Sequence, residues 1–474
     1  MSGGAPSPSR LVRLKNDRFC VIGAGASGLC MAKYLKQTGL QNFVIYESGT
    51  QIGGLWCYGN DNNESSAYKT LHINTPKHVT NFSDFKFADD VQMFPNHRDM
   101  HDYLVAYATH FGLVPHIRFK SRVADVRPAP DYRPERPRWA VTTQDGRTDI
   151  FDCVIVASGH LSQPMHDESL RSPFAGEYLH THDYREPAPY VGKRVCVVGA
   201  GNSACDIAAD ICMTAERTVL VARSGVVIAP KLICGVPFHD VKLAVERRWI
   251  PKRIRDRFMS LMIYILQGRM TDLGFKPLTK RAHGTSNPVI VPHIRYRRIT
   301  VKQGIDRIEG KRIHFVDGTS EEFDVVMAGT GYRITVPFLS DAILPIADNS
   351  PNLYKRVASP DWAGLHFIGF LNTGTVSLLD AFEHQVQWLV PFLTGEAVLP
   401  DRQEMLADIQ AKKDFIARHY IKSLRHGIEE NFMTYYPELK RSQKEGLRRR
   451  QRLRGRQGGT AERREGLSGQ EVAR

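Results

Sequence analysis

Glycines at one place near the start of the sequence have the spacing that lets a backbone hold a phosphate. They are Gly23, Gly25 and Gly28, in the order G-x-G-x-x-G. An apolar stretch of strand length precedes them, and a helical pattern follows. In such a unit the first glycine permits the tight turn, the second lets a pyrophosphate approach the backbone, and the third lets helix and strand pack closely. The phosphates then meet the free N–H groups at the positive end of the helix.

A second run repeats this pattern later in the chain. It comprises Gly199, Gly201, Asn202, Ser203 and Ala204, and it also lies between a strand pattern and a helix pattern. The third glycine is replaced by alanine, a residue that this position also accepts. Two such units predict two dinucleotides on an α/β protein with two Rossmann-like domains.

The residue that follows the second strand of each unit indicates which dinucleotide binds there. Glu47 lies 24 residues after Gly23, and Arg223 lies 24 residues after Gly199. An acid at this place accepts hydrogen bonds from ribose hydroxyls, whereas arginine pairs with a 2′-phosphate. The first unit therefore suits FAD and the second suits NADPH. The alternative for Arg223 is an ordinary surface arginine.

The order of the remaining elements predicts that one domain interrupts the other. Residues 151–159 and 323–331 each combine a buried strand with a small-residue turn, and each follows a hairpin pattern with an Asp-Gly turn. We therefore expect a β-meander after each Rossmann unit. The expected segments are an N-terminal tail (1–17), a first FAD segment (18–165), an NADPH domain (166–335) with a helical insertion at about 224–299, a second FAD segment (336–437) and a basic disordered tail (438–474).

A short polar stretch before the second unit carries a further pattern. Phe174, Gly176, His180 and Tyr184 have the spacing F-x-G-x-x-x-H-x-x-x-Y, and Tyr184 lies 15 residues before Gly199. Together with the two glycine runs, this resembles the linker fingerprint of the class B flavoprotein monooxygenases, and within them of the flavin-containing monooxygenases. The resemblance spans roughly residues 18–435.

Further segments are similar to that family. Gly54, Leu55 and Trp56 resemble its loop near the flavin, and Asn74 stands where the family has an active-site asparagine. The turn that ends at Gly331 resembles the A-T-G-Y turn of the family, with a glycine added before the threonine. The segment LHFIGFLNTG resembles the strand and loop that close over the flavin.

The resemblance implies a reaction and roles for these residues. NADPH reduces FAD, the reduced flavin captures O2 as a C4a-hydroperoxide, and one oxygen passes to the nitrogen or sulfur of a small substrate. An amide such as that of Asn74 donates and accepts hydrogen bonds without titrating. The alternative for Asn74 is a turn residue ahead of Thr75-Pro76. His180 is expected to contact NADP+ or the linker, and a purely structural role is the alternative.

Other activities stay open on the same scaffold. Baeyer–Villiger enzymes of this class usually end the linker pattern with Trp, whereas this chain has Tyr184-Arg185, which favours heteroatom oxygenation over ketone oxygenation. A dithiol–disulfide reductase needs a cysteine pair, but the eight cysteines contain no C-x-x-C. A nucleotide-binding redox sensor is the non-enzyme alternative.

The composition limits the cellular compartments and the ligands to be expected. The chain is 42% hydrophobic and 24% charged, and we expect neither a spanning helix nor a secretory signal. The scattered cysteines favour a reducing, cytoplasmic compartment. Residues 440–474 contain 12 Lys or Arg and 4 Glu, so they contribute +8 of the net charge of +14. This composition predicts a disordered tail, and nucleic-acid binding is not expected. No metal is expected, because His97 and His101 lack the Glu and third ligand of a zinc site.

The insertion has an amphipathic pattern with two explanations. Residues 246–258 are basic, and residues 259–266 are mostly apolar. Such a stretch can lie on a membrane surface as a peripheral contact. It can also form a helical cap against the substrate channel or against a second subunit of a homodimer, and the cap is the preferred hypothesis.

Overall fold

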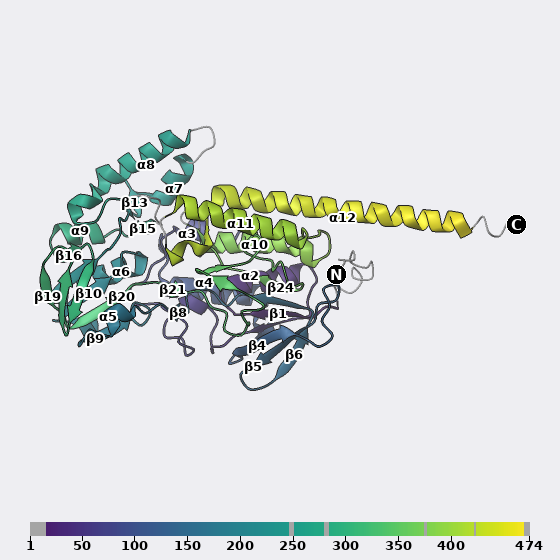
Figure 1. The fold of residues 1–474 in the computed structure, drawn as a ribbon, viewed down its shortest axis with the longest axis horizontal. Helices are drawn as coiled ribbons and strands as arrows, with labels where there is room; N and C mark the ends of the chain where they lie inside the picture. The colour runs from purple at the N-terminus through teal and green to yellow at the C-terminus, as the bar shows by residue number, and fades with distance from the viewer. Residues whose placement is uncertain (1–15, 246–250, 279–283, 374–376, 421–422, 469–474) are drawn as a thin grey trace.

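Two parallel five-stranded sheets form the framework, and each carries one of the glycine runs (Figure 1). The computed structural model describes residues 16–245, 251–278, 284–373, 377–420 and 423–468. The first sheet has the order β24-β7-β1-β2-β3, with β1 (Phe19–Ile22), β2 (Phe43–Tyr46), β3 (Ile117–Arg118), β7 (Cys153–Val156) and β24 (Leu365–Phe367). The second has the order β16-β11-β10-β20-β9, with β9 (Glu177–His180), β10 (Arg194–Val198), β11 (Arg217–Val221), β16 (Ile299–Lys302) and β20 (Val325–Ala328).

The two sheets have equivalent registers, which confirms the predicted α/β architecture. Phe19 pairs with Cys153 in the first sheet, and Val195 pairs with Val325 in the second, so both crossover strands end level with the glycine turns. Strand β24 follows the whole second unit in sequence but pairs with β7 of the first sheet. A later segment therefore completes the first unit, as expected for a domain that another domain interrupts.

Each unit also has a three-stranded antiparallel meander, as the Asp-Gly turns predicted. The strands are β4 (Val123–Pro128), β5 (Trp139–Thr143) and β6 (Thr148–Phe151) in the first unit, and β17 (Ile305–Glu309), β18 (Arg312–Phe315) and β19 (Ser320–Glu322) in the second. Trp139, the first residue of β5, and Phe323, which directly follows β19, are buried. The two connections between the units pair with each other as β8 (Gln163–Pro164) and β21 (Tyr332–Arg333).

Helices cover the first sheet on the side seen in the upper half of Figure 1. They are α2 (Ala26–Gln37), α3 (Lys77–Thr80), α4 (His97–His110), α10 (Leu378–Leu393), α11 (Arg402–His419) and α12 (Phe432–Ser468). Helix α10 packs against both α2 and α12. Its apolar residues, including Trp388 and Leu389, are buried in the largest core cluster. This packing explains why the segment after β24 belongs to the first unit.

Helix α12 corrects the prediction of a disordered tail from residue 438. Ser442 on this helix is buried and accepts a hydrogen bond from Trp388 Nε1 at 3.3 Å, and its hydroxyl lies 2.9 Å from that of Tyr354. Leu439 is buried too, and Arg449 pairs with Glu404. Charge content did not reveal this helix, because it ignores where each residue lies around the helix axis. Here the apolar side chains lie on one face and the charged side chains on the solvent face. Residues 469–474 and 1–15 of the predicted tails lie outside the described residues.

The second unit has its own helices and short strands. They are α5 (Glu168–Arg171), α6 (Asn202–Ile211), α7 (Phe238–Val245), α8 (Lys252–Gln267), α9 (Ile290–Arg295), β12 (Ile228–Ala229), β13 (Leu232–Ile233), β14 (Val236–Pro237) and β15 (Thr285–Ser286). Helix α8 rises above this unit at the upper left of Figure 1. The predicted insertion thus contains helices, together with short strands; its residues 246–250 and 279–283 lie outside the described part.

The remaining short elements connect these layers. They are the single turns η1 (Gly54–Trp56), η2 (Val114–His116), η3 (Ala188–Tyr190), η4 (Met270–Leu273) and η5 (Leu424–Ile428), and the strands β22 (Ile346–Ala347), β23 (Ser350–Pro351), β25 (Asn372–Thr373) and β26 (Glu429–Glu430). Within the ranges that the structure describes, no helix has both the length and the apolar character required to cross a bilayer.

Candidate active site

The first glycine run forms a turn between β1 and α2 in which close contacts exclude side chains. Gly23 has φ of +108°, and a Cβ on it would lie 2.6 Å from the carbonyl oxygen of Ala157. A Cβ on Gly28 would lie 2.0 Å from the carbonyl oxygen of Gly23. Beside Gly25, by contrast, the nearest atom to an added Cβ is the Cα of Gly54, at 3.8 Å. The turn is therefore closed toward the sheet and open in front of Gly25, as a phosphate cradle requires.

Glu47 follows β2 and holds the first cradle in place. Its Oε2 accepts a hydrogen bond from the N–H of Ala24 at 2.8 Å, and its Oε1 accepts one from the N–H of Gly49 at 2.8 Å. The side chain is only 4% exposed, yet it borders the cleft in front of the cradle. Ser48 Oγ and Asn62 Nδ2 also donate to Oε1, at 3.3 Å and 3.5 Å, so Oε2 is the oxygen whose second lone pair can still accept from a ribose hydroxyl.

The second glycine run repeats the turn, except that the glycine and the alanine that face each other have changed places. Gly199 has φ of +120°, and a Cβ on it would lie 2.4 Å from the carbonyl oxygen of Gly329. A Cβ on Gly329 would lie 2.8 Å from the Cβ of Ala204. The first unit places Gly28 beside Ala157, and the second places Ala204 beside Gly329. The glycine added to the family turn is thus explained, because it makes room for the methyl group of Ala204.

Both cradles present uncapped helix ends to a ligand. Helix α2 begins at Ala26 with Gly25 as its N-cap, and α6 begins at Asn202 with Gly201 as its N-cap. Neither N-cap supplies a side-chain hydrogen bond. The first N–H groups of a helix need acceptors, and a pyrophosphate provides them. The residues present therefore fit two dinucleotides, FAD at the first cradle and NADPH at the second.

Arg223 comes shortly after β11 and borders the same cleft as the second cradle. Its side chain is exposed. Among the described residues, its guanidinium makes neither an ion pair nor a hydrogen bond. A guanidinium without a carboxylate partner can pair with a phosphate in a bidentate manner. This environment suits a 2′-phosphate at the end of the second unit.

The two cradles open into one cleft with a volume of about 3110 Å³. Most of the predicted site residues line it, namely Gly23, Gly25, Glu47, Gly54, Leu55, Trp56, Asn74, Gly199, Gly201, Asn202, Ser203, Ala204, Arg223 and Gly331. Gly28 and His180 do not. Gly28 lies behind its turn, where the helix meets the strand, and His180 is fully buried. A cleft that both cradles share is what hydride transfer between two bound dinucleotides requires.

Asn74 lies on the segment between η1 and α3 and borders the cleft. Its Oδ1 is buried, and no hydrogen-bond partner for it exists among the described residues. The following helix α3 has Pro76 as its N-cap and receives no side-chain cap. Asn74 therefore does not act as the cap of this turn. A buried carboxamide oxygen without a partner is costly, and such atoms mark places where a ligand or water completes the hydrogen bonding.

The linker pattern is largely structural. Gly176 is required because a Cβ there would lie 2.6 Å from the carbonyl oxygen of Asp324. Tyr184 is fully buried and donates a hydrogen bond to Asp210 Oδ2 on α6 at 2.5 Å. His180 ends strand β9, and its Nδ1 accepts from the N–H of His182 at 3.0 Å. Burial lowers the pKa of His180 to about 4, so the ring is neutral near pH 7.

Two cleft residues were not foreseen from the sequence. Lys231 donates a hydrogen bond from Nζ to the carbonyl oxygen of Ile73 at 3.1 Å, next to Asn74, and burial lowers the pKa of its ammonium. Arg425 of η5 lies against the second cradle. Both are single basic residues outside any motif, so spacing offered no signal for either of them.

Comparison with known proteins agrees with this geometry. The model of the FMO-like family, described as flavin-binding monooxygenase-like, matches residues 16–444. The chain belongs to this family. Flavin-containing monooxygenase 5 of Rattus norvegicus is 31% identical over 451 residues, which cover 90% of this chain and 82% of the rat protein. As a member of the family, the chain is an FAD-dependent monooxygenase that uses NADPH and O2.

Solved structures share the fold of this flavin-binding monooxygenase. S-allyl-L-cysteine S-oxygenase from Allium sativum has a TM-score of 0.68 and 24% identity, covering 90% of this chain and 88% of that one. Cyclohexanone monooxygenase from Rhodococcus sp. Phi1 bound to NADP+ has a TM-score of 0.65 and 16% identity, covering 91% and 98%. The two-unit architecture is therefore common to enzymes named for sulfur oxygenation and for ketone oxygenation.

Proposed function

We propose that this monooxygenase oxygenates a soft nitrogen or sulfur nucleophile on a small organic substrate, with Asn74 as the catalytic amide. The observation that carries the proposal is the buried, unpaired Oδ1 of Asn74 at the cleft into which both cradles open. A neutral amide suits oxygen transfer to a soft nucleophile, because such a nucleophile brings its own electron pair and needs no strong base. The curated relatives named flavin-containing monooxygenases favour this substrate class.

The bound cofactors would supply the redox chemistry, namely a hydride from NADPH and activation of O2 by reduced FAD. The residues of the chain itself would bind and orient the two cofactors and shield them from water. Gly25 and Gly201 let the two pyrophosphates approach the helix ends, Glu47 accepts from a ribose, and Arg223 pairs with the 2′-phosphate. Asn74 would present its amide to the bound ligands, with Oδ1 as an acceptor and NH2 as a donor, and such a fixed dipole costs no reorganisation during reaction.

The insertion would limit the access of water to this cleft. Helices α7 and α8 border the cleft with both apolar and polar side chains. The apolar ones are Phe238, Met259 and Ile263, and the polar ones are His239, Lys242, Arg255, Asp256 and Ser260. Apolar side chains at a cleft wall lower the local dielectric and strengthen the hydrogen bonds that fixed donors make. This arrangement supports the helical cap over the substrate channel, and we propose that role for α7 and α8.

A substrate screen tests the function. Purified, FAD-loaded protein is given NADPH, O2 and, in turn, a tertiary amine, a thioether and a cyclic ketone, with products identified by mass spectrometry. We expect N-oxide or sulfoxide as the main product. Ester or lactone as the main product would instead assign the Baeyer–Villiger activity, and NADPH oxidation without any oxygenated product would favour the redox-sensor alternative.

Asn74→Asp tests the residue assignment. The carboxylate has nearly the same shape, but it loses the NH2 donor and adds a negative charge to the cleft. Loss of one preorganised donor typically lowers the rate by ~10²–10³. We expect that loss in product formation with FAD still bound, and a rise in NADPH consumed per product formed. Asn42→Asp, on an exposed side chain outside the cleft, is the matched control. Equal coupling in both variants would contradict the assignment.

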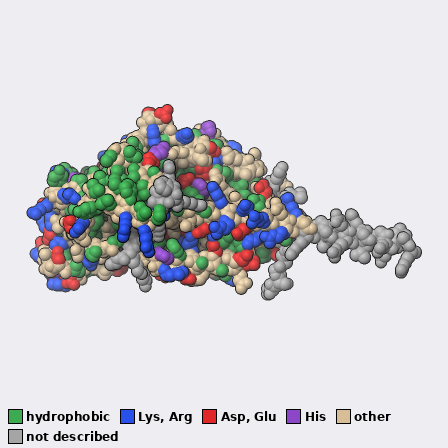
Figure 2. Space-filling model, turned by 90° about the horizontal axis from the view of Figure 1, so that it is seen from above, with side chains coloured by type: hydrophobic (Ala, Val, Ile, Leu, Met, Phe, Trp, Pro, Cys, Tyr) green, Lys and Arg blue, Asp and Glu red, His purple; other side chains and the backbone are tan. Residues whose placement is uncertain are grey.

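The outer face of α8 supports a peripheral contact with an anionic lipid surface. Ile254, Phe258, Leu261 and Ile265, at intervals of three and four residues, are 42–65% exposed. Figure 2 shows hydrophobic side chains gathered on this face of the molecule, with Lys and Arg side chains beside them. Exposed Arg253 lies on the same helix. Because an apolar stripe with basic flanks suits a bilayer surface, we propose that this face docks there.

Vesicle flotation with phosphatidylcholine alone and with added phosphatidylserine tests this contact. We expect Phe258→Glu with Ile265→Glu to lower partitioning into the anionic vesicles by at least about tenfold, since each buried large apolar side chain is worth roughly 1.5–3 kcal/mol. Leu447→Glu, at an exposed leucine on α12, is the control. A shift of the double variant from dimer to monomer in sedimentation, without a change in flotation, would instead assign this face to a homodimer.

We also propose a cytoplasmic location. The eight cysteines all lie in the described part of the chain and form no disulfide there, and seven of them are buried. Cysteines that stay reduced are typical of compartments rich in glutathione and thioredoxin. Fractionation of cells that express the tagged chain tests this, and recovery from an oxidising compartment would contradict it.

A further inference from the structure

A segment of the first unit reaches across to the second cradle. The turn η5 follows α11, and it carries Arg425 into the cleft. The Nη1 of Arg425 lies 3.2 Å from the position that a Cβ on Gly201 would occupy. Gly201 is the glycine that leaves room for a pyrophosphate at the start of α6. A guanidinium therefore lies beside the place where the second dinucleotide would put its phosphates.

The charge of Arg425 is not balanced by a direct partner. Within the described part of the chain, its guanidinium makes neither an ion pair nor a hydrogen bond. The nearby Glu429 is buried and lies 3.6 Å from the ring of His426. Desolvation lowers the pKa of Arg425, and the carboxylate of Glu429 raises it in part. The side chain of Arg425 is exposed at the cleft, so an anion bound there can reach the guanidinium.

The turn that carries Arg425 is held firmly on the first unit. A Cβ on Gly427 would lie 2.4 Å from the carbonyl oxygen of Asn349, so the two backbones are in close contact. Asn372 Nδ2 donates to the carbonyl oxygen of Arg425 at 3.4 Å, and Asn372 also pairs with Glu429 between β25 and β26. Arg425 is thus presented from a fixed backbone.

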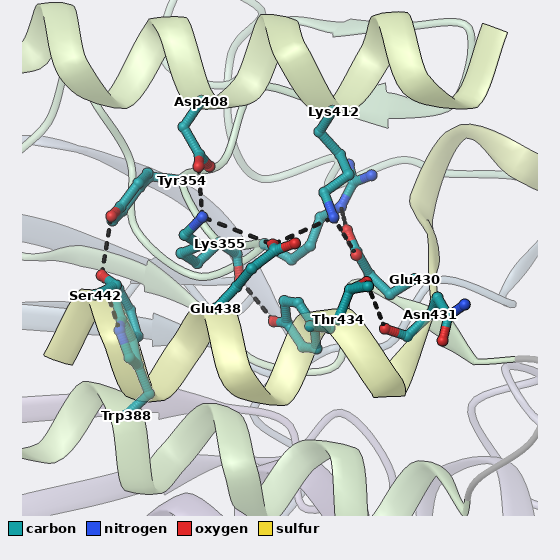
Figure 3. Close-up of polar contacts among 12 residues, drawn as sticks. Tyr354, Lys355, Trp388, Asp408, Lys412, Glu430, Asn431, Thr434, Glu438 and Ser442 are labelled. Atoms are coloured by element: carbon teal, nitrogen blue, oxygen red, sulfur yellow. Dashed lines mark hydrogen bonds and ion pairs between the residues drawn. The ribbon is translucent and has the colours of Figure 1, made fainter. Parts of the chain in front are cut away.

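A buried ion network anchors the residues that follow. Glu430 is 1% exposed at its side chain and pairs with Arg356 at 2.9 Å and with Lys412 at 2.8 Å. Lys412 lies 3.4 Å from Glu438 on α12, and Glu438 also contacts Lys355 (Figure 3). The network joins α11, α12 and the strand connections of the first unit. Removing one member would leave an uncompensated charge, so the network favours a single position for this turn.

We propose that Arg425 pairs with the pyrophosphate of NADPH at the second cradle, so that the dinucleotide joins the two units of the molecule. The inference rests on the proposed assignment of NADPH to that cradle. The role proposed for Arg425 differs from that of Arg223. Arg223 would read the 2′-phosphate that only NADPH has, whereas Arg425 would contact the pyrophosphate that NADPH and NADH share.

This difference defines the experiment. Dissociation constants of NADP+, NAD+ and adenosine 2′-monophosphate are measured by calorimetry on FAD-loaded wild type, Arg425→Gln, Arg425→Lys and Arg223→Ala. A guanidinium–phosphate pair strengthens binding by about 10- to 100-fold. We expect Arg425→Gln to weaken NADP+ and NAD+ by the same factor in that range and to leave adenosine 2′-monophosphate unchanged. Arg223→Ala should weaken NADP+ and adenosine 2′-monophosphate but not NAD+.

Three further measurements separate this contact from a folding defect. Arg425→Lys keeps the charge but loses the planar fork, so its affinity should fall between those of wild type and Arg425→Gln. Flavin content should equal that of wild type in both variants. Hydrogen exchange of residues 424–428 should slow on addition of NADP+ in wild type but not in Arg425→Gln.

Three outcomes would overturn the inference. Dissociation constants of Arg425→Gln within twofold of wild type would show that the guanidinium does not contact the dinucleotide. A loss confined to NADP+ would show that Arg425 reads the 2′-phosphate. Absence of NADP+ binding by the wild type would refute the assignment of the second cradle itself, and so would be distinguished from a failure of Arg425 alone.

Discussion

The substitution Gly329→Ala tests whether Ala204 at the start of α6 requires a glycine opposite it, directly after β20. Gly329 does not have a left-handed φ, so alanine there meets no backbone strain. The added Cβ would, however, lie 2.8 Å from the Cβ of Ala204 and 2.9 Å from the carbonyl oxygen of Val198, against 3.4–4 Å for ordinary contact. The start of α6 must therefore move away from the strand by more than half an ångström, by subtraction of these distances. Overpacking of this kind costs about 1–3 kcal/mol.

The second substitution Ala204→Gly should rescue this variant in part. It removes the closer of the two contacts, but the contact with the carbonyl oxygen of Val198 stays. Alone, Ala204→Gly should cost up to about 1 kcal/mol, because glycine is a poor helix former. In combination with Gly329→Ala it should be favourable, with a coupling energy of about 1–2 kcal/mol. The double variant reproduces the distribution of glycine and alanine that the first unit has at Gly28 and Ala157.

The two units are measured separately, because a chain with two domains need not unfold in one step. Calorimetric NADP+ binding reports the second cradle, and bound flavin reports the first. We expect Gly329→Ala to weaken NADP+ binding and lower the first thermal transition while flavin content stays unchanged. Gly455→Ala, on α12 outside the cleft, is the control, because Gly455 lacks a left-handed φ and an added Cβ would meet no atom of the described residues within 4 Å. Failure of Ala204→Gly to improve Gly329→Ala would refute the reasoning.

The remaining predictions concern three other residues. Gly25→Val should abolish most FAD binding, because its branched side chain would fill the open space in front of the cradle; full flavin occupancy in the purified variant would contradict the site. Arg223→Ala should lower the preference for NADPH over NADH by about 10- to 100-fold in steady-state kinetics and leave NADH use unchanged, since only the 2′-phosphate loses a charge-assisted pair; equal losses would assign Arg223 a structural role. Because burial lowers the pKa of His180 to about 4, below the ordinary value near 6.5, the unfolded chain binds a proton that the folded chain does not between these values. The contribution of His180 to stability is therefore complete above about pH 6.5 and falls by up to about 3 kcal/mol as the pH drops toward 4. His180→Gln should flatten the decline of the unfolding temperature over this range, and an unchanged slope would contradict the shift.

Local sequence was sufficient to predict the two cradles. Strand, turn and helix lie within about thirty residues in each unit, and the positive φ of Gly23 and Gly199 follows from the sharpness of one turn. The acid after β2 and the arginine after β11 were found by the same spacing. The interrupted topology also followed, because each crossover strand has its own buried pattern and its own Asp-Gly hairpin.

The wrong prediction of a disordered tail has a specific physical cause. Charge content was averaged along the segment, whereas stability depends on which face of a helix finds a partner. Leu439 and Ser442 of α12 find one in α10, where Trp388 and Phe392 are packed. Composition does not contain this information, because the partner helix lies far away in the sequence.

Only the tertiary structure decided which distant residues share the cleft. It placed Arg425 beside Gly201, Lys231 beside the segment of Asn74, and Gly329 beside Ala204. It also divided α8 into a face that borders the cleft and an exposed face. These placements depend on how whole sheets and helices pack, and packing is set by the summed shape of many side chains rather than by any local spacing. The sequence by itself therefore determined the two nucleotide cradles, whereas the fold determined which side chains face the ligands that they would hold.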